Sequence, residues 1–173
     1  FQIEPMAARD LAVGVIADTH GYFDPAVPRL FKGCGMIVHL GDIGSPEILA
    51  ELERIAPVVA IRGNHEPQAL MHLPTLRLVE LGGVRTLLSH GLSSMEREVA
   101  RAVFPQFYER FRAERIRLVL FGHTHDAEVY EEDGVVFANP GFAGPPEHGR
   151  ARSVAILRLA AVEGIFEFLP LKP

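Results

Sequence analysis

The stretch LAVGVIADTH, residues 11–20, joins an apolar run to a polar cluster. Residues 11–17 are apolar or small and partly β-branched, which is typical of a buried strand. Asp18, Thr19 and His20 follow directly. We therefore expect a strand over residues 11–17 whose carboxyl end carries side chains suited to chemistry.

Four further apolar runs end in the same way, and we expect strands over residues 36–40, 58–61, 84–88 and 118–121. The clusters that follow them are Gly41-Asp42, Gly63-Asn64-His65, Ser89-His90-Gly91 and Gly122-His123-Thr124-His125. Helices are expected over residues 25–32 and 46–55, the second capped by Ser45. These strand–helix–strand units predict a largely parallel order for the first strands.

The second half of the sequence favours antiparallel pairs. Gly82-Gly83 and Asp133-Gly134 each lie between two short apolar runs, which indicates hairpins. The expected hairpin strands are 77–81 with 84–88, 127–131 with 135–138, and 153–159 with 165–169. Residues 95–117 carry Val99, Val103, Phe107 and Phe111 at four-residue spacing, which predicts an amphipathic helix that Pro105 kinks or splits.

About ten strands in a chain of this length predict two sheets packed face to face. We therefore expect an α/β fold, a four-layer α-β-β-α sandwich with two mixed sheets and with helices outside. The 173 residues predict a single domain, and we leave residues 1–9 outside the fold argument as a flexible extension.

The composition excludes several classes of protein. With 48% hydrophobic residues the chain is not disordered, and with one cysteine it is not a disulfide scaffold. No apolar run is long enough to cross a bilayer, and no secretory signal precedes the first strand, so we expect a cytoplasmic protein without a membrane partner. The net charge of −5 gives no strong signal for nucleic acid.

The polar clusters can meet in space, because the carboxyl ends of neighbouring parallel strands lie at one edge of a sheet. Asp, Asn and neutral His without Cys suit Mn, Fe, Zn, Co or Ni. Seven candidates are too many for one tetrahedral ion, but they match two ions about 3.5–4 Å apart if Asp42 bridges them. The seven are Asp18, His20, Asp42, Asn64, His90, His123 and His125.

In this order, the five motifs resemble those of the calcineurin-like metallophosphoesterase superfamily, and the Asp18–Gly21 opening resembles its small single-domain YfcE-like phosphodiesterases. The resemblance covers residues 11–169 and implies a two-sheet sandwich with two divalent ions at one edge, Mn before Fe, Zn, Ni or Co. It implies that one ion takes Asp18, His20 and His125. The other then takes Asn64, His90 and His123, with Asp42 between the two ions.

The resemblance also implies that Asn64 and His65 bind the substrate phosphate and that His65 protonates the leaving group. In the expected reaction, a hydroxide that bridges the two ions attacks the phosphate in line, with Asp42 and His65 as catalytic residues. Arg62 is a further candidate for phosphate binding, although a surface ion pair explains an arginine there equally well.

The sequence departs from the family pattern in two places. Glu66 stands where the family usually has Asp, and we expect its carboxylate to orient His65 or to hold the turn. Phe142 replaces a Ser after Asn139-Pro140-Gly141, where it can form an aromatic wall. His148 and Arg150 follow in a Gly- and Pro-rich loop, where solvent exposure and substrate contact are both open.

The expected function is hydrolysis of a small phosphodiester. A phosphomonoesterase, a nucleotidase or a small nuclease could use the same site. A protein-binding scaffold like one retromer subunit is the alternative from another class. Homo-oligomers are common among small enzymes, and a second copy of this chain is therefore one candidate partner.

Overall fold

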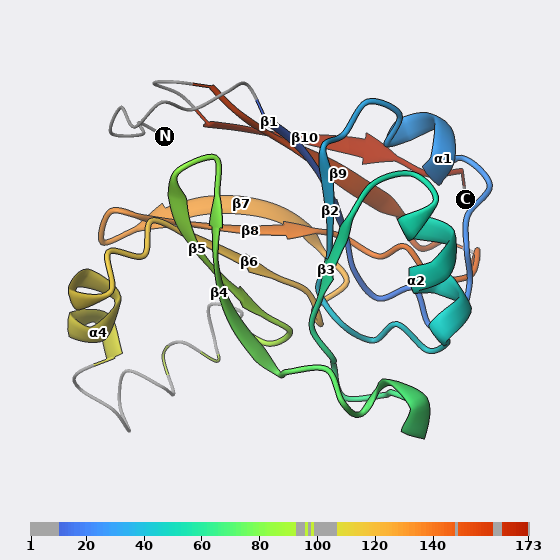
Figure 1. The fold of residues 1–173 in the computed structure, drawn as a ribbon, viewed down its shortest axis with the longest axis horizontal. Helices are drawn as coiled ribbons and strands as arrows, with labels where there is room; N and C mark the ends of the chain where they lie inside the picture. The colour runs from blue at the N-terminus through green and yellow to red at the C-terminus, as the bar shows by residue number, and fades with distance from the viewer. Residues whose placement is uncertain are drawn as a thin grey trace.

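A computed structural model describes residues 11–92, 96, 98, 107–147, 149–160 and 164–172. Its strands form two five-stranded sheets, which lie face to face (Figure 1). The first sheet has the order β10 (Gly164–Pro170), β9 (Ser153–Leu159), β1 (Leu11–Ile16), β2 (Met36–His39) and β3 (Val58–Ala60). The second has the order β4 (Leu76–Leu81), β5 (Val84–Ser89), β6 (Leu118–Phe121), β8 (Val135–Pro140) and β7 (Ala127–Glu132).

Both sheets are mixed, as the sequence predicted. The pairs β1–β2, β2–β3, β5–β6 and β6–β8 are parallel, and the pairs β1–β9, β9–β10, β4–β5 and β7–β8 are antiparallel. In the first sheet Ile16 pairs with His39, and His39 pairs with Ala60. In the second sheet Ser89 pairs with Phe121. The parallel strands of each sheet therefore end level with one another, and the polar clusters begin at the same edge.

Helices cover the outer faces of the two sheets. Helices α1 (Val27–Leu30) and α2 (Pro46–Glu53) lie against the first sheet, and α4 (Phe107–Ala113) lies against the second (Figure 1). A short 3-10 helix, η1, spans Gln68–Leu70. Three apolar layers result: one between the sheets, one under α1 and α2, and one under α4. The four-layer sandwich is thus confirmed.

The expected helices are longer than the observed ones. Ser45 caps α2 by accepting the Glu47 N–H, but α2 ends at Glu53. Helix α1 is a single turn whose N-cap makes no side-chain hydrogen bond. The helix expected over 95–117 is described only at residues 96, 98 and 107–117, where α4 is the regular helix and Phe111 is buried in the core. Val99, Val103, Pro105 and the extension 1–9 lie outside the described residues.

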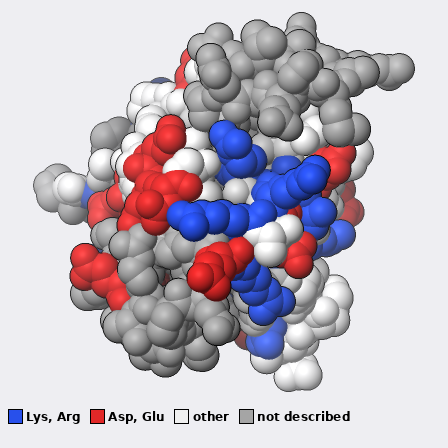
Figure 2. Space-filling model, turned by 90° about the vertical axis from the view of Figure 1, so that its left-hand side faces the viewer, with Lys and Arg blue, Asp and Glu red and all other residues white. Residues whose placement is uncertain are grey.

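The face that carries α4 has charges of both signs. Figure 2 shows a band of Lys and Arg side chains there, flanked by acidic ones. Arg110 and Arg112 of α4 are exposed, and Arg85 pairs with Glu114 at 3.2 Å. This mixture does not make the uniform positive field that phosphate backbones favour.

Among the described residues, no helix combines the length and apolar character needed to span a bilayer.

The aromatic layer under α4 gives a test of the packing. Phe137 of β8 is fully buried and stacks on Tyr130 with ring centroids 5.5 Å apart. We expect Phe137→Ala to lower the unfolding free energy by about 3–5 kcal/mol, because it removes a ring and leaves a cavity. Val129→Ala, on an exposed position of β7, is expected to change it by less than about 0.5 kcal/mol. Chemical denaturation measures both, and similar small losses would contradict this packing.

Candidate active site

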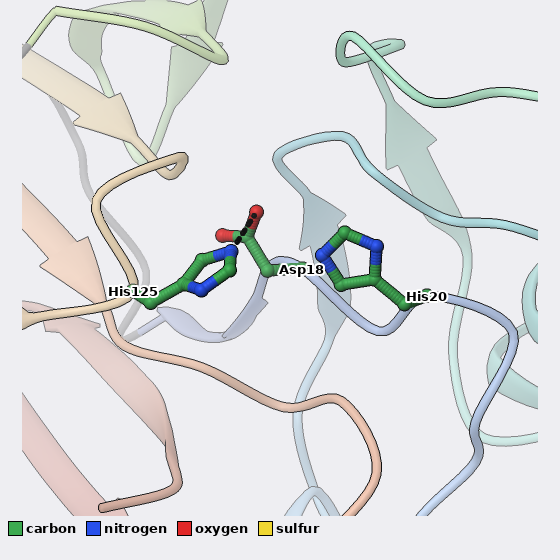
Figure 3. A group of neighbouring side chains, drawn as sticks. All are labelled: Asp18, His20 and His125. Atoms are coloured by element: carbon green, nitrogen blue, oxygen red, sulfur yellow. Dashed lines mark ion pairs between the residues drawn. The ribbon is translucent and has the colours of Figure 1, made fainter. Parts of the chain in front are cut away.

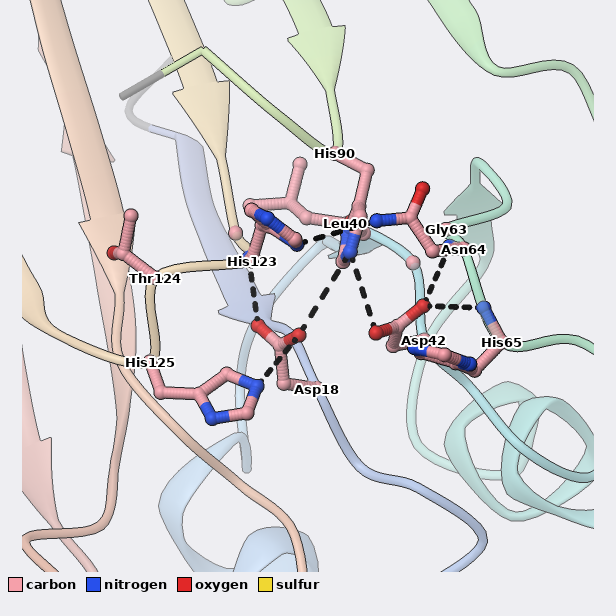
Figure 4. A network of polar contacts seen from close by, with 12 residues as sticks. Asp18, Leu40, Asp42, Gly63, Asn64, His65, His90, His123, Thr124 and His125 are labelled. Atoms are coloured by element: carbon pink, nitrogen blue, oxygen red, sulfur yellow. Dashed lines mark hydrogen bonds and ion pairs between the residues drawn. The ribbon is translucent and has the colours of Figure 1, made fainter. Parts of the chain in front are cut away.

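The polar clusters meet at one edge of the sandwich, as Figure 4 shows. The loop after β1 brings Asp18 and His20, and the loop after β2 brings Asp42. The loops after β3, β5 and β6 bring Asn64 with His65, His90, and His123 with His125. The structure thus gathers residues that are up to 107 positions apart, such as Asp18 and His125.

Backbone conformation turns these side chains into the site. Five of the candidate ligands have a positive φ, a conformation that L-residues other than Asn and Asp seldom adopt. They are Asp18 (55°), His20 (46°), Asp42 (52°), His123 (73°) and His125 (64°). Such residues cost of order 1–3 kcal/mol each and persist where the surrounding structure fixes them, which is common at functional sites.

The loops after β1 and β2 fix one another. Beyond the strands, Asp18 N–H donates to Gly41 O at 3.0 Å and His20 N–H donates to Asp42 O at 2.9 Å, so the parallel ladder continues into the site. A Cβ on Gly41, where φ is +94°, would stand 2.6 Å from Gly63 N. Only glycine allows the loop after β3 to approach so closely.

Asp18 divides its two carboxylate oxygens between the backbone and the site. Its Oδ2 accepts the backbone N–H of His123 at 3.1 Å. Its Oδ1 is buried without a hydrogen-bond partner among the described residues and faces His125 Nε2 at 3.3 Å (Figure 3). The side chain is fully buried. One oxygen therefore holds the loop after β6, and the other is left for a ligand.

Asp42 repeats this division. Its Oδ1 accepts the backbone N–H groups of Asn64 at 2.7 Å and of His65 at 2.9 Å. Its Oδ2 lies 3.4 Å from His90 Nε2 and 3.9 Å from His20 Nε2. Burial opposes ionisation of Asp42, but the His90 ring and these N–H groups outweigh it, so the pKa of the carboxyl lies well below its usual value.

The His90 ring is oriented by a hydrogen bond on the side that faces away from the site. Its Nδ1 donates to Leu40 O at 2.7 Å, which leaves the lone pair of Nε2 directed at the site. This Nε2 has no hydrogen-bond partner among the described residues and lies 4.0 Å from Asp18 Oδ1. Burial alone lowers the pKa of His90, yet the nearby Asp42 carboxylate and the Leu40 carbonyl outweigh it and raise that pKa.

The arrangement fits bound cations. Two groups, Asp18 with His20 and His125, and Asp18 with Asp42 and His90, have ligand atoms within 4.8 Å of one another. Tetrahedral ligands about 2.1 Å from an ion lie roughly 3.4 Å apart, close to the separations found here. The buried lone pairs of Asp18, His20 and His90 without described partners are unfavourable unless a cation faces them.

The remaining expected ligands lie at the rim of this cluster. Asn64 and His123 are exposed, and Asn64 Nδ2 lies 3.3 Å from His123 Nδ1. The His123 ring is 5.2 Å from the His90 ring. His90 Nε2 itself faces both Asp18 Oδ1 and Asp42 Oδ2. His65 is exposed, with its ring centroid 6.5 Å from that of His20.

Other candidates from the sequence take different places. The Arg62 guanidinium contacts the sulfur of Met71 at 3.6 Å, and its Nε has no hydrogen-bond partner among the described residues. Phe142 is a buried wall, 4.6 Å from the His125 ring and 5.9 Å from the His20 ring. Arg150 covers that wall at 4.8 Å, and His148 lies outside the described residues.

A buried chain of hydrogen bonds, the relay, lies behind the site. Gly41 N–H donates to His39 Nδ1 at 3.2 Å, so the ring proton lies on Nε2 and donates to Thr19 Oγ1 at 3.0 Å. The Thr19 hydroxyl then donates to Ile43 O at 2.9 Å. Thr19 lies between two candidate ligands in the sequence, but that position gives no sign of its partners.

Comparison with known proteins places these residues in a family context. The sequence pattern of the calcineurin-like phosphoesterase superfamily domain matches residues 11–161. A probable metallophosphoesterase of Methanothermobacter thermautotrophicus is 31% identical over 163 residues, covering 86% of each chain. A phosphodiesterase of Methanocaldococcus jannaschii is 23% identical over 76% of this chain and 83% of its own.

Solved structures share the fold. A Streptococcus pneumoniae protein described as a predicted phosphoesterase has a TM-score of 0.68 at 20% identity, covering 95% of this chain and 91% of that one. Vps29 from Entamoeba histolytica, solved with zinc, has a TM-score of 0.69 at 22% identity, covering 92% and 99%. At these identities the likeness shows the sandwich alone.

The relay makes stability depend on pH. Burial, with the nearby His90, lowers the pKa of His39 to about 3, well below about 6.5 in an unfolded chain. Below about pH 6.5 the unfolded chain takes up a proton that the folded one does not, so the stability that His39 contributes is complete above this pH and is lost towards pH 3.

We expect the difference in unfolding free energy between the wild type and His39→Gln to shrink by up to about 1.4 kcal/mol per pH unit below pH 6. Urea unfolding between pH 7.5 and 4.5 measures it. A difference that stays constant with pH would contradict a neutral His39.

Proposed function

The chain belongs to the calcineurin-like phosphoesterase superfamily, and from its site we propose a hydrolase that cleaves phosphodiesters with two divalent ions. The observation that carries this proposal is the pair of buried carboxylates, Asp18 and Asp42. Each gives one oxygen to backbone N–H groups and turns the other towards histidine nitrogens. Two anions held in this way require positive charge between them.

We assign the ligands from these separations together with the family resemblance. A first ion would be held by Asp18, His20 and His125, whose ligand atoms lie together. A second would be held by His90 with Asn64 and His123 at the rim, the set that the resemblance implies. Asp42 Oδ2 lies between His20 Nε2 at 3.9 Å and His90 Nε2 at 3.4 Å, one from each set, and this supports Asp42 as the bridge. Oxygen and imidazole ligands without thiolate suit Mn²⁺ first, with Fe, Zn, Ni and Co as alternatives.

Ions held here would supply Lewis-acid chemistry, lowering the charge on a phosphate and the pKa of a water. The chain itself then has to help the leaving group depart. His65 suits this task because its backbone N–H is fixed on Asp42 while its side chain is exposed beside the cluster. A proton or hydrogen bond from the His65 ring to the departing oxygen is worth about 10²–10⁴-fold in rate.

The open rim favours a diester. Asn64, His65 and His123 are exposed, which leaves room for groups on both sides of a phosphate. A relative of similar length is named a phosphodiesterase. A binding scaffold of the Vps29 kind has the same sandwich, but a scaffold does not require buried lone pairs aimed at one another. Activity on aryl phosphodiesters against monoesters separates the hydrolytic candidates.

Metal binding tests the ligand set. We expect isothermal titration of the metal-stripped chain with Mn²⁺ to give about two ions per chain. Asp42→Asn keeps the side chain's shape but removes the bridging charge, and we expect it to weaken at least one site about 10-fold or more. Asp126→Asn, an exposed acid in the loop after β6, is the control and should bind as the wild type does. A single ion per wild-type chain would contradict the two-ion proposal.

Turnover tests the role of His65. We expect His65→Ala to lower kcat on a phosphodiester by about 10²–10⁴-fold, because it removes the proton donor. Metal content should stay unchanged, since residue 65 keeps the N–H that binds Asp42. His72→Ala removes another exposed histidine, whose Nδ1 donates to Ala69 O, and should be neutral. Full turnover in His65→Ala would remove His65 from the reaction.

A further inference from the structure

Glu66 lies next to the proposed proton donor, and its carboxylate binds the loop after β2. Oε1 accepts the backbone N–H groups of Ile43 at 3.0 Å and of Gly63 at 3.0 Å. Oε2 accepts those of Ile43 at 3.1 Å and of Gly44 at 3.1 Å. One carboxylate therefore collects three N–H donors from two loops, and charged acceptors make stronger hydrogen bonds than neutral ones.

The connection between the two loops is reciprocal. The Asp42 side chain, from the loop after β2, accepts the N–H groups of Asn64 and His65. The Glu66 side chain, from the loop after β3, accepts the N–H groups of Ile43 and Gly44. Each loop thus carries a carboxylate that binds the backbone of the other. Neither loop can shift without breaking hydrogen bonds at both ends of this cross-link.

The cross-link also fixes the proposed catalytic groups. Asp42 precedes Ile43, whose N–H binds the Glu66 carboxylate, and His65 precedes Glu66 itself. Each proposed catalytic residue is therefore next to one partner of the cross-link. The close approach of Gly41 to Gly63 keeps the backbones of the two loops in contact. Without the Glu66 carboxylate, three N–H groups lose their acceptor, and small shifts of the Asp42 oxygen and of the His65 ring become possible. Displacements of about 1 Å are enough to lose about 10²-fold in rate.

We propose that Glu66 is a positioning residue: its carboxylate locks the loops after β2 and β3 together and so sets the placement of the His65 ring relative to the Asp42 ligand oxygen. This inference rests on the proposed phosphoesterase function. The length of the side chain matters, because the carboxylate has to reach Ile43 and Gly44 across the gap between the loops. An amide cannot replace it fully, since its NH₂ would face an N–H donor.

The leaving group reveals whether Glu66 acts through His65. A weakly acidic phenol needs proton donation to depart, whereas 4-nitrophenol hardly does. With methyl phenyl phosphate we expect Glu66→Gln to lower kcat about 10–100-fold, and with methyl 4-nitrophenyl phosphate several-fold less. Glu53→Gln, an exposed glutamate of α2, is the matched control and should leave both rates unchanged.

A double-mutant cycle supplies the second criterion. If Glu66 works through His65, its substitution in the His65→Ala background has little further effect on kcat, because residues that act as a unit are not additive. Equal losses with both leaving groups, or additive losses in the cycle, would overturn the proposal and leave Glu66 a structural residue only. Should Glu66→Gln not fold, Glu66→Asp, which keeps the charge but shortens the arm, is judged by the same ratio of rates.

Cobalt binding separates this inference from the proposed function. Titration with Co²⁺, followed by its visible spectrum, reports the ligand geometry without any turnover. We expect Glu66→Gln to weaken Co²⁺ binding about 10-fold or more, because Asp42 is less well held. A wild-type chain that binds Co²⁺ but hydrolyses neither ester would refute the function, while unchanged Co²⁺ binding and an unchanged spectrum in Glu66→Gln would refute the role of Glu66.

Discussion

The division of each buried carboxylate between backbone and site is the interaction on which the active site depends. Asp18 and Asp42 are almost fully buried, and an isolated buried carboxylate is strongly unfavourable. Backbone N–H groups from other strand ends satisfy one oxygen of each. Since those N–H groups belong to the loops after β6 and β3, the sheet register itself decides where the second oxygen lies.

Electrostatics prepare these carboxylates for a cation. The pKa of Asp42 lies below its usual value, so its carboxyl is ionised at neutral pH. The His90 ring is oriented through its other nitrogen, which donates to Leu40 O. A ligand set that is already ionised and oriented loses little conformational freedom when an ion binds, which favours affinity.

The sequence predicted the positions that meet and not the contacts that hold them. Apolar runs ending in Asp18, Asp42 and His90 predict strands whose ends share an edge, because strand period and register follow local pattern. The N–H donors that bind the Glu66 carboxylate, and the relay from His39 to Thr19, could not be predicted. They depend on loop conformations with positive φ and on pairs about twenty residues apart, for which no periodic signal exists. The length of the helix expected over residues 25–32 was overestimated for a related reason. Its apolar residues, such as Phe31, which packs against Gly14, are buried without requiring a longer helix.

Phe142, the wall of the site, is held in place by residues far from it in the sequence. From the sequence it was known only as a departure from the family pattern. Phe142 contacts the His125 and His20 rings, and a side chain at Gly144 would collide with its ring. Behind the wall, buried Arg152 donates to Gly144 O at 2.7 Å and pairs with Asp24 at 2.9 Å. Asp24 belongs to the loop that carries His20, so one ion pair ties the wall to a ligand loop. Removing either partner would leave an unpaired buried charge, which is more costly than losing the contact itself. The aromatic wall and the candidate metal ligands are therefore held by the same framework.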